Sequence, residues 1–388
     1  MKSNYKRLGD YIRQVDVRNK DDERYDLLGV SVEKCFISSI ANTVGTDWHN
    51  YKIIKKGQFC YIPDTSRRGD KIGIAHLTDR EIGLVSAVYT VFEVWNKELV
   101  PEYLMLWFKR PEFDRYARYH SHGSVREIFD WEEMCNVELP VPPIEEQEKI
   151  VDAYETIEKR IALKRKINDN LEATAQAVFQ EQFASFYGAD ELPNGYSIVN
   201  LDSLCTVKGG KRLPADCELL DTPTEHPYIR VRDVGRSRYV CLTNQFQYID
   251  EETYSAIFRY IVNTGDIVIS IVGTIGLLGK VHSSLDKANL TENCVKLANI
   301  HTVTSDYLYY TLCYKKQIKE IELLTVGAVQ AKLPMYNIQS MKILVPPTKV
   351  IEEFQNKMDV FNEQIEANTV EVQRLYELQE VLLAKMSD

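Results

Sequence analysis

The chain has 388 residues, of which 44% are hydrophobic, enough for ordinary globular cores in two or three domains. No stretch approaches the roughly 18 apolar residues that a membrane span needs, so we expect no membrane span. No apolar run follows Met1–Lys6, so we expect no secretory signal and predict a cytoplasmic protein. The eight cysteines include no C-x-x-C pair, which argues against a zinc ribbon or a disulfide framework.

The net charge of −10 is distributed unevenly. Eight of the ten excess negative charges lie in residues 141–187 and 344–388, so the large segments 1–140 and 188–343 are near neutral. Each large segment can therefore present a basic face to DNA, although free DNA-binding domains are usually basic overall. We expect modest DNA affinity for the chain by itself, with further phosphate contacts supplied by a partner.

The two large segments have the pattern of mixed α/β domains. β-branched and aromatic runs between glycine-centred turns, Lys55–Gln58 in one segment and Asn263–Asp266 in the other, are typical of strands. The predicted strands are Tyr51–Ile54, Gln58–Ile62, Leu84–Val94, Tyr228–Val231, Ile267–Val272 and Asn293–Leu297. The predicted helices are Glu102–Tyr116 and Ser305–Ile321.

The chain contains an internal repeat with a constant offset of 204 residues. Tyr103-Leu104 recurs as Tyr307-Leu308, and Val141-Pro142-Pro143 recurs as Val345-Pro346-Pro347. The remaining anchors are Gly123-Ser124-Val125 with Gly327-Ala328-Val329, Ile161 with Ile365, and Leu171 with Leu375. Such self-similarity indicates duplication of one structural unit.

Each Pro-Pro is followed by about 40 residues without Gly or Pro, in which apolar residues alternate at spacings of three and four, typical of a coiled-coil seam. Each helix would be about 60 Å long. Lys164, Asn168 and Asn368 are polar seam positions of the kind that set register. We predict an antiparallel pair of helices forming the spine of a pseudo-two-fold molecule; the alternative is that each helix packs only on its own domain. The predicted spine residues are Ile150, Tyr154, Ile157, Ile161, Leu171, Val178, Phe354, Met358, Phe361, Ile365, Leu375 and Leu382.

No catalytic signature is found in the sequence. The glycine-rich stretch Gly273–Lys280 has five residues between its outer glycines and Val281 after the lysine, so it is not a phosphate-binding P-loop. No H-E-x-x-H or G-x-S-x-G motif is present, and His120 and His122 have no evident third metal ligand. We expect no metal site, no cofactor on this chain and no catalysis by it, while a site assembled from scattered residues stays an alternative.

Basic loops with aromatic neighbours favour contact with DNA. Arginine can hold guanine with two hydrogen bonds, while lysine and serine bind phosphates. Arg230 with Arg232, and Arg236 with Arg238, would share a face if the chain is extended there. For any one of these residues, a solvated surface position is the alternative. The candidate DNA contacts are Ser66, Arg67, Arg68, Lys71, Arg126, Lys208, Lys211, Arg212, Arg230, Arg232, Arg236, Arg238, Thr274, Gln330 and Lys332.

The second half carries, in order, Gly265–Ser270, Gly273–Gly276, Tyr307–Tyr310 and Gly327–Gln330, followed by Val345-Pro346-Pro347 and a long helix. In the order of these motifs, the chain resembles the specificity subunit of Type I restriction-modification systems over nearly its whole length. The first half departs from this pattern, because Phe59–Pro63 and Arg67–Asp70 stand where the G-T-I-G block would be, which predicts a different class of recognition domain.

The resemblance implies double-stranded DNA as ligand, two methyltransferase subunits docked on the helices, and two restriction/translocase subunits. S-adenosylmethionine, ATP and magnesium would then belong to those partners. We predict an α+β monomer that is internally pseudo-dimeric and reads a bipartite, asymmetric DNA site. Alternatives are a Type IIB-like or methylation-only complex, a coiled-coil scaffold that binds protein, and an enzyme with an unrecognised site. The predicted divisions are residues 1–140, first recognition domain; 141–187, central helix; 188–344, second recognition domain; and 345–388, C-terminal helix.

Overall fold

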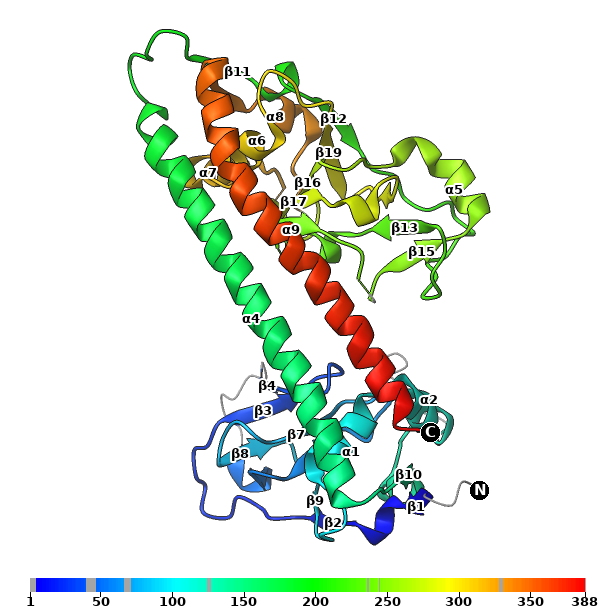
Figure 1. Ribbon diagram of the computed structural model, residues 1–388. Coiled ribbons are helices and arrows are strands. Elements are labelled where there is room, and N and C mark those ends of the chain that lie inside the picture. The colour runs from blue at the N-terminus through cyan, green and yellow to red at the C-terminus, as the bar shows by residue number, and fades with distance from the viewer. Residues whose placement is uncertain are drawn as a thin grey trace. The chain divides into compact units, whose positions relative to one another are not determined.

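The computed structural model describes residues 5–39, 47–65, 71–123, 127–235, 237–243, 245–327 and 331–387. Two compact units are present: Met1–Ile161 with Leu375–Asp388, and Ala162–Arg374. Each unit contains one mixed α/β domain and a part of each long helix, α4 (Ile144–Phe183) and α9 (Thr348–Lys385) (Figure 1). Among the described residues, no helix combines the length and apolar character needed to cross a membrane.

The first domain is built on two four-stranded sheets. One has the order β2-β9-β6-β7, and the other has the order β4-β3-β8-β5, in which β3 and β8 are parallel. The strands are β1 (Tyr5–Arg7), β2 (Ile12–Val15), β3 (Leu27–Val30), β4 (Phe36–Ser38), β5 (Lys52–Lys55), β6 (Phe59–Tyr61), β7 (Ile74–His76), β8 (Ile82–Val85), β9 (Thr90–Val94) and β10 (Glu138–Pro140), with β1 paired to β10. The helices are α1 (Pro101–Lys109), α2 (Pro111–Tyr119) and α3 (Trp131–Asn136).

The second domain repeats this plan with a five-stranded sheet, β12-β19-β16-β17-β14, and a three-stranded sheet, β15-β13-β18. The strands are β11 (Ser197–Asn200), β12 (Thr206–Gly209), β13 (His226–Ile229), β14 (Tyr239–Val240), β15 (Gln247–Ile249), β16 (Ile267–Ser270), β17 (Leu278–Val281), β18 (Asn289–Leu290), β19 (Cys294–Ala298) and β20 (Lys342–Val345), with β11 paired to β20. The helices are α5 (Glu251–Ile257), α6 (Ser305–Leu312), α7 (Lys315–Leu324) and α8 (Met335–Ser340).

The two domains share one topology. The order β2-β9-β6-β7 matches β12-β19-β16-β17, and the parallel pair β3–β8 matches β13–β18. From β7 onward each helix of the first half starts 204 residues before its counterpart, as in α1 with α6 and α4 with α9. The prediction of a different class of domain in the first half was therefore wrong at the level of topology. The halves differ in added edge strands, β5 in one and β14 in the other, and in a longer β6–β7 loop in the first half.

Three predicted elements are each split in two. The predicted strand Leu84–Val94 is β8 and β9, joined by a turn in which the Tyr89 N–H donates to the Ser86 carbonyl. The predicted helix Glu102–Tyr116 breaks at Arg110, which is extended because Pro111 disfavours helical geometry in the residue before it. The equivalent break in Ser305–Ile321 falls at Tyr314, which is also extended although no proline follows it.

In the second unit, α4 and α9 run antiparallel and pack on each other and on the domain. Phe183 of α4 lies 5.4 Å from Phe354 of α9, ring centre to ring centre, and 5.1 Å from Tyr307 of α6. Farther along, Lys164 pairs with Glu371 at 2.8 Å, and the Asn368 amide donates to Asn168 at 2.8 Å. The polar seam positions therefore bond to one another, as expected for residues that set register.

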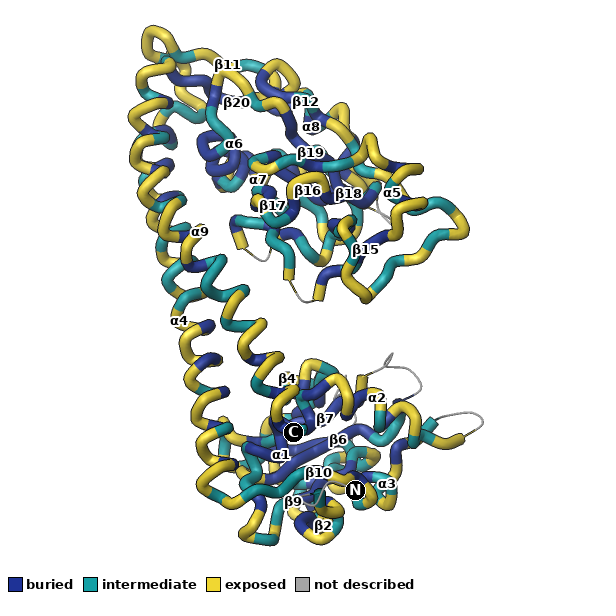
Figure 2. Tube along the Cα trace, turned by 45° about the vertical axis from the view of Figure 1, so that its right-hand side comes forward, coloured by how far each residue is buried: buried dark blue, intermediate teal, exposed yellow. Residues whose placement is uncertain are grey.

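In the first unit, the start of α4 and the end of α9 join the core of the first domain. Val151 and Tyr154 of α4 are buried together with Leu383 of α9 and with Met386, which directly follows that helix. Along both units, every predicted spine residue is buried or partly buried. Figure 2 shows buried residues concentrated within the domains and along the facing sides of the helices, with exposed residues on their outer sides.

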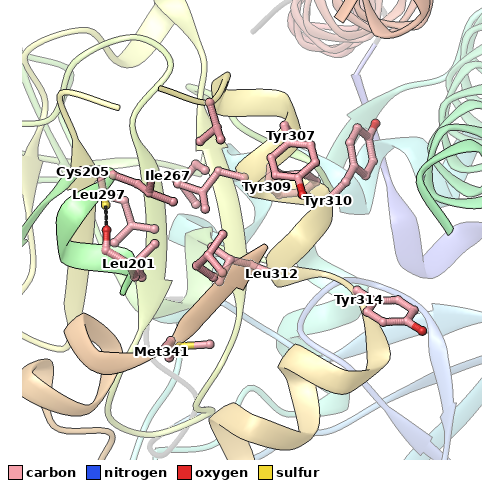
Figure 3. Close-up of a cluster of buried hydrophobic side chains, with 14 of the residues drawn as sticks. Leu201, Cys205, Ile267, Leu297, Tyr307, Tyr309, Tyr310, Leu312, Tyr314 and Met341 are labelled. Atoms are coloured by element: carbon pink, nitrogen blue, oxygen red, sulfur yellow. Dashed lines mark hydrogen bonds between the residues drawn. The ribbon is translucent and has the colours of Figure 1, made fainter. Parts of the chain in front are cut away.

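Helix α6 carries much of the second core. Tyr307, Leu312 and their neighbours are fully buried, with the sheet residues Ile267 and Leu297 on one side of α6 (Figure 3). Tyr310 points from the other side of α6, where α4 and α9 lie. This helix therefore connects the sheet of the domain to the two long helices.

We expect Phe354→Ala to destabilise the second unit by about 3–5 kcal/mol, because it removes a fully buried ring from contact with Phe179, Phe183 and Tyr307. Hydrogen exchange of α6 amides should report the loss. Val360→Ala, on the same helix but 70% exposed, should change stability by less than about 0.5 kcal/mol. Equal protection of α6 in the two variants would contradict the packing described above.

Candidate nucleic-acid interface

Two loops that are far apart in sequence meet in the first domain. The β6–β7 loop contacts the hairpin between α2 and α3 through a bridge between Asp64 and Ile128. The Thr65 N–H donates to the Glu127 carbonyl at 3.0 Å, and the Thr65 hydroxyl donates to the Ser121 hydroxyl at 2.8 Å. We call these two segments, 63–71 and 121–128, the first paired loops. The candidate contacts Ser66, Arg67, Arg68 and Arg126 belong to these segments but lie outside the described residues.

Lys71, at the end of the first paired loops, is exposed and lies 3.6 Å from the Glu33 carboxylate. Tyr119 at the end of α2 is 82% exposed. Leu323, the residue 204 positions later at the end of α7, is 85% exposed. Large apolar side chains are thus exposed at matching positions beside both loop pairs. The sequence did not predict this, because in the sequence these residues fit the pattern of ordinary amphipathic helices.

The second domain has the same arrangement in segments 271–277 and 325–333, the second paired loops. Val272 forms a bridge with Lys332, and the Leu333 N–H donates to the Ile271 carbonyl at 2.9 Å. Thr274 and Lys332 are exposed, so the structure brings two candidate contacts from separate stretches to one surface. Gly273 and Gly276 have φ angles of 80° and 81°, which explains the glycines of the G-T-I-G block. Gln330 lies outside the described residues.

A second group of candidates gathers at the carboxyl ends of the parallel strands β13 and β18. The Lys211 N–H donates to the Leu290 carbonyl at 2.8 Å, and its carbonyl accepts from the Tyr228 hydroxyl at 2.7 Å. Arg212 pairs with Glu292 at 2.8 Å. A Cβ on Gly210 would lie 2.1 Å from the Thr291 carbonyl oxygen, so only glycine permits this close approach. Both cationic side chains remain exposed, and Lys208 is exposed on the neighbouring edge strand β12.

Arg230 follows β13 in the same group. Its guanidinium is held by Asp233 at 3.1 Å and by the Gln247 amide oxygen, and only 15% of the side chain is exposed. Arg232 is more accessible and donates to the Gln245 carbonyl at 3.3 Å. Val231–Asp233 form a 3-10 turn, so the expectation of two arginines on one extended face was wrong. Of this pair, Arg232 is the one placed to reach a ligand.

Arg238 is not a DNA contact, which corrects the prediction. Its side chain is buried. The guanidinium pairs with Asp306 of α6, donates to the Tyr310 hydroxyl at 3.0 Å and lies 3.6 Å from the Glu172 carboxylate of α4. A buried guanidinium needs such carboxylates, because an unpaired buried charge is costly. The sequence did not reveal this role, because the partners are 68 and 66 positions away. Arg236 lies outside the described residues.

Asp306 is the centre of this polar junction between the domain and the helices. One carboxylate oxygen accepts from Arg238 and from Lys280 of β17 at 2.6 Å. The other accepts from the α9 side chains Gln355, at 2.8 Å, and Asn362, at 2.7 Å. Burial alone would raise the pKa of Asp306, but Lys280 and Arg238 hold it below its ordinary value. Burial also raises the pKa of Glu172 and lowers that of Lys280.

A comparison with models of protein families agrees with the duplication. The sequence model described as the Type I restriction modification DNA specificity domain matches residues 10–173 and again residues 193–376. The chain belongs to this family. Both copies of the repeat are thus recognised as the same kind of domain, and each match includes most of the long helix that follows the domain.

Named relatives have low sequence identity to the chain. The Type I restriction enzyme MjaIX specificity subunit of Methanocaldococcus jannaschii is 23% identical over 74% of this chain and 68% of its own length. The Type I restriction enzyme HindI specificity subunit of Haemophilus influenzae is 20% identical over 93% of this chain and 92% of its own length. A solved Type I restriction-modification S subunit from M. genitalium is 13% identical, with a TM-score of 0.47 over 99% of this chain and 96% of that one.

The described residues contain no group of three or more His, Cys, Asp or Glu side chains arranged to hold a metal ion. His120 and His122 both face one carboxylate, that of Glu133, at 3.1 Å and 3.7 Å. Both domains therefore carry exposed cations near the paired loops, and in the second domain Gly210, Gly273 and Gly276 shape the loops that carry them.

We expect Asp306→Asn to destabilise the second unit by about 3–5 kcal/mol, because it removes the carboxylate that buried Arg238 and partly buried Lys280 share. The pKa of this carboxylate is lowered in the folded chain, so its contribution is complete above the ordinary value of 3.8 and declines as the pH falls below it. Urea unfolding at pH 7 and at pH 3 should show a smaller gap between wild type and variant at pH 3. Asp202→Asn, at an exposed position, is the control, and an equal gap at both pH values would contradict an ionised Asp306.

Proposed function

We propose that this chain is the sequence-specific DNA-recognition subunit of a Type I restriction-modification complex, and that it reads a bipartite, asymmetric site. The observation that carries the proposal is the duplicated specificity domain, with one shared topology and different loops. Loops of different length and charge on the same framework suit two half-sites of different sequence. The long helices then determine the separation of the half-sites.

Recognition by each domain divides between phosphates and bases. Lysines such as Lys71, Lys211 and Lys332 are exposed and would contact the phosphate backbone, which fixes orientation but carries no sequence information. Arg232 has its side chain 56% exposed and its backbone fixed by a 3-10 turn, so it is the best-supported base reader of the second domain. The second paired loops add Thr274, whose hydroxyl can donate to or accept from a base edge or phosphate.

The chemistry belongs, in this proposal, to partner subunits. Two methyltransferase subunits would dock on the helices, and two restriction/translocase subunits would complete the complex. S-adenosylmethionine, ATP and magnesium would be bound by those partners. This chain would be a monomer within the complex, and it would contribute specificity and spacing. We place the complex in the cytoplasm, where its DNA substrate is found.

We expect Arg232→Ala, in the assembled methyltransferase complex, to relax sequence preference in the second half-site at a cost of about 1–3 kcal/mol, with the first half-site unchanged. Lys211→Ala should weaken binding to all sequences alike and reduce the salt dependence by about one phosphate contact. Sequencing of methylated sites and binding at several salt concentrations distinguish the two effects. Lys349→Ala on α9 is the control. A changed preference in both half-sites for Arg232→Ala would argue against separate recognition by the two domains.

Arg67→Ala and Arg68→Ala make the converse test. They belong to the first paired loops, so their effect on preference should be confined to the first half-site. The same methylation sequencing measures it.

The purified chain alone should neither methylate nor cleave DNA, because its sequence carries no catalytic motif. The measurement is transfer of radiolabelled methyl groups from S-adenosylmethionine into DNA, with nicking followed on a supercoiled plasmid. A preparation from cells lacking the partner genes is the control for contamination. Transfer that persists in that preparation would contradict the assignment of catalysis to partners.

A further inference from the structure

A pocket in the first unit occupies the position that Arg238 fills in the second. The pocket has a volume of about 300 Å³ and lies against α1 and the start of α4. In the second domain, the Arg238 guanidinium is surrounded by side chains from β17 and α6. Those side chains are Lys280, Asp306, Tyr309 and Tyr310, and the residues 204 positions before them, His76, Glu102, Met105 and Leu106, all line the pocket.

The helix that forms the far wall corresponds as well. In the second unit, α9 provides Gln355 and Asn362 to the carboxylate of Asp306. Their counterparts on α4, Val151 and Glu158, line the pocket. The same surface of the repeat therefore surrounds a guanidinium in one half and a pocket in the other.

Two lysines, Lys34 and Lys109, also line the pocket, but each is paired with a carboxylate other than Glu102. Lys34 comes from the loop after β3, which corresponds to the loop after β13 that leads to Arg238, but its ammonium donates to Asp114 and to the Ile72 carbonyl. Lys109 pairs with Glu158 at 2.8 Å. Across the described part of the chain, no lysine or arginine forms an ion pair with Glu102. Burial lowers the pKa of His76 and outweighs the opposing effect of the nearby Glu102 carboxylate, so burial disfavours a charged imidazole at this position.

We propose that this pocket receives an arginine side chain of the docked methyltransferase subunit, with its guanidinium paired to Glu102. The proposal rests on the proposed function, because it requires a partner on the helices. The duplicated half supplies the reason for arginine, since the same framework already holds Arg238. Glu102 and Glu155 would repel DNA phosphates, so a cationic side chain fits the pocket and the nucleic acid does not. The stem of the arginine would lie along Met105 and Leu106.

This arrangement makes the two docking positions unequal. In the second half, Arg238 already pairs with Asp306. The equivalent position of the second half therefore cannot bind an arginine of a partner subunit. A single substitution in the pocket should therefore weaken one of the two methyltransferase subunits and leave the other unchanged.

The test uses the full chain and the methyltransferase subunit encoded with it, with binding measured by titration calorimetry. Glu102→Gln keeps the size of the side chain and removes its charge, and we expect one binding step to weaken by about 10- to 100-fold. Glu102→Asp should retain part of the affinity. Glu148→Gln on α4, outside the pocket lining, is the matched control and should bind within twofold of wild type. Circular dichroism of each variant excludes unfolding as the cause.

A photo-crosslinker at Thr78, on the pocket rim, should label a partner peptide that contains the arginine. Replacing that arginine by glutamine should reproduce the loss, and combining it with Glu102→Gln should add little more. Equal affinity of wild type and Glu102→Gln for a partner that binds both would overturn the pocket proposal alone. No binding of the partner to the wild-type chain would overturn the proposed function, and the pocket proposal with it. Labelling of a peptide without arginine, or additive losses, would also overturn the pocket proposal.

Discussion

The second recognition domain depends on a cluster of aromatic rings where α4, α6 and α9 meet. Phe179 and Phe183 of α4, Phe354 of α9 and Tyr307 of α6 are buried against one another. Rings of this size bury more apolar area than any other side chain, so separating them would be costly. The aromatic contact therefore holds the domain on the helices. Apolar contacts alone do not fix how the domain is oriented on the helices, and the hydrogen bonds and ion pairs around Asp306 supply that orientation.

Duplication explains why the halves share a framework and differ where they meet ligands. The helices and sheets that bury apolar side chains recur at one offset, because packing limits what a core can accept. Exposed loops are free of that limit, and the β6–β7 loop of the first half differs in length and charge from the matching β16–β17 loop of the second. The two halves also differ at the polar junction between domain and long helices. In one half the chain supplies its own guanidinium to the carboxylate on the first turn of α6, and in the other the matching carboxylate on α1 lines a pocket.

Charge is arranged in keeping with a subunit that binds DNA as part of a larger complex. Most of the excess negative charge lies on the two long helices, while each domain carries exposed cations, which in the second domain lie on loops shaped by glycine. Negative charge on the helices disfavours contact with DNA phosphates, so the distribution separates the helices from the exposed cations of the domains. Burial of Arg238 shows that a charged loop residue can serve the framework instead, since its carboxylate partners come from α6 and α4.

The sequence alone determined the repeat, the two long helices, their seam and the family, because these depend on periodic patterns and on motifs at a constant offset. Glycine positions such as Gly265 and Gly273 could also be predicted from the sequence, because a positive φ strongly favours that residue type. Tertiary structure decided which loops meet, as in the bridge between Val272 and Lys332, and which arginines stay accessible. It also decided that the halves share one topology and that α6 ends before Tyr314. The reason is that strand pairing, burial and ion pairing depend on residues that are distant in sequence, and a local sequence pattern does not indicate which distant residues meet.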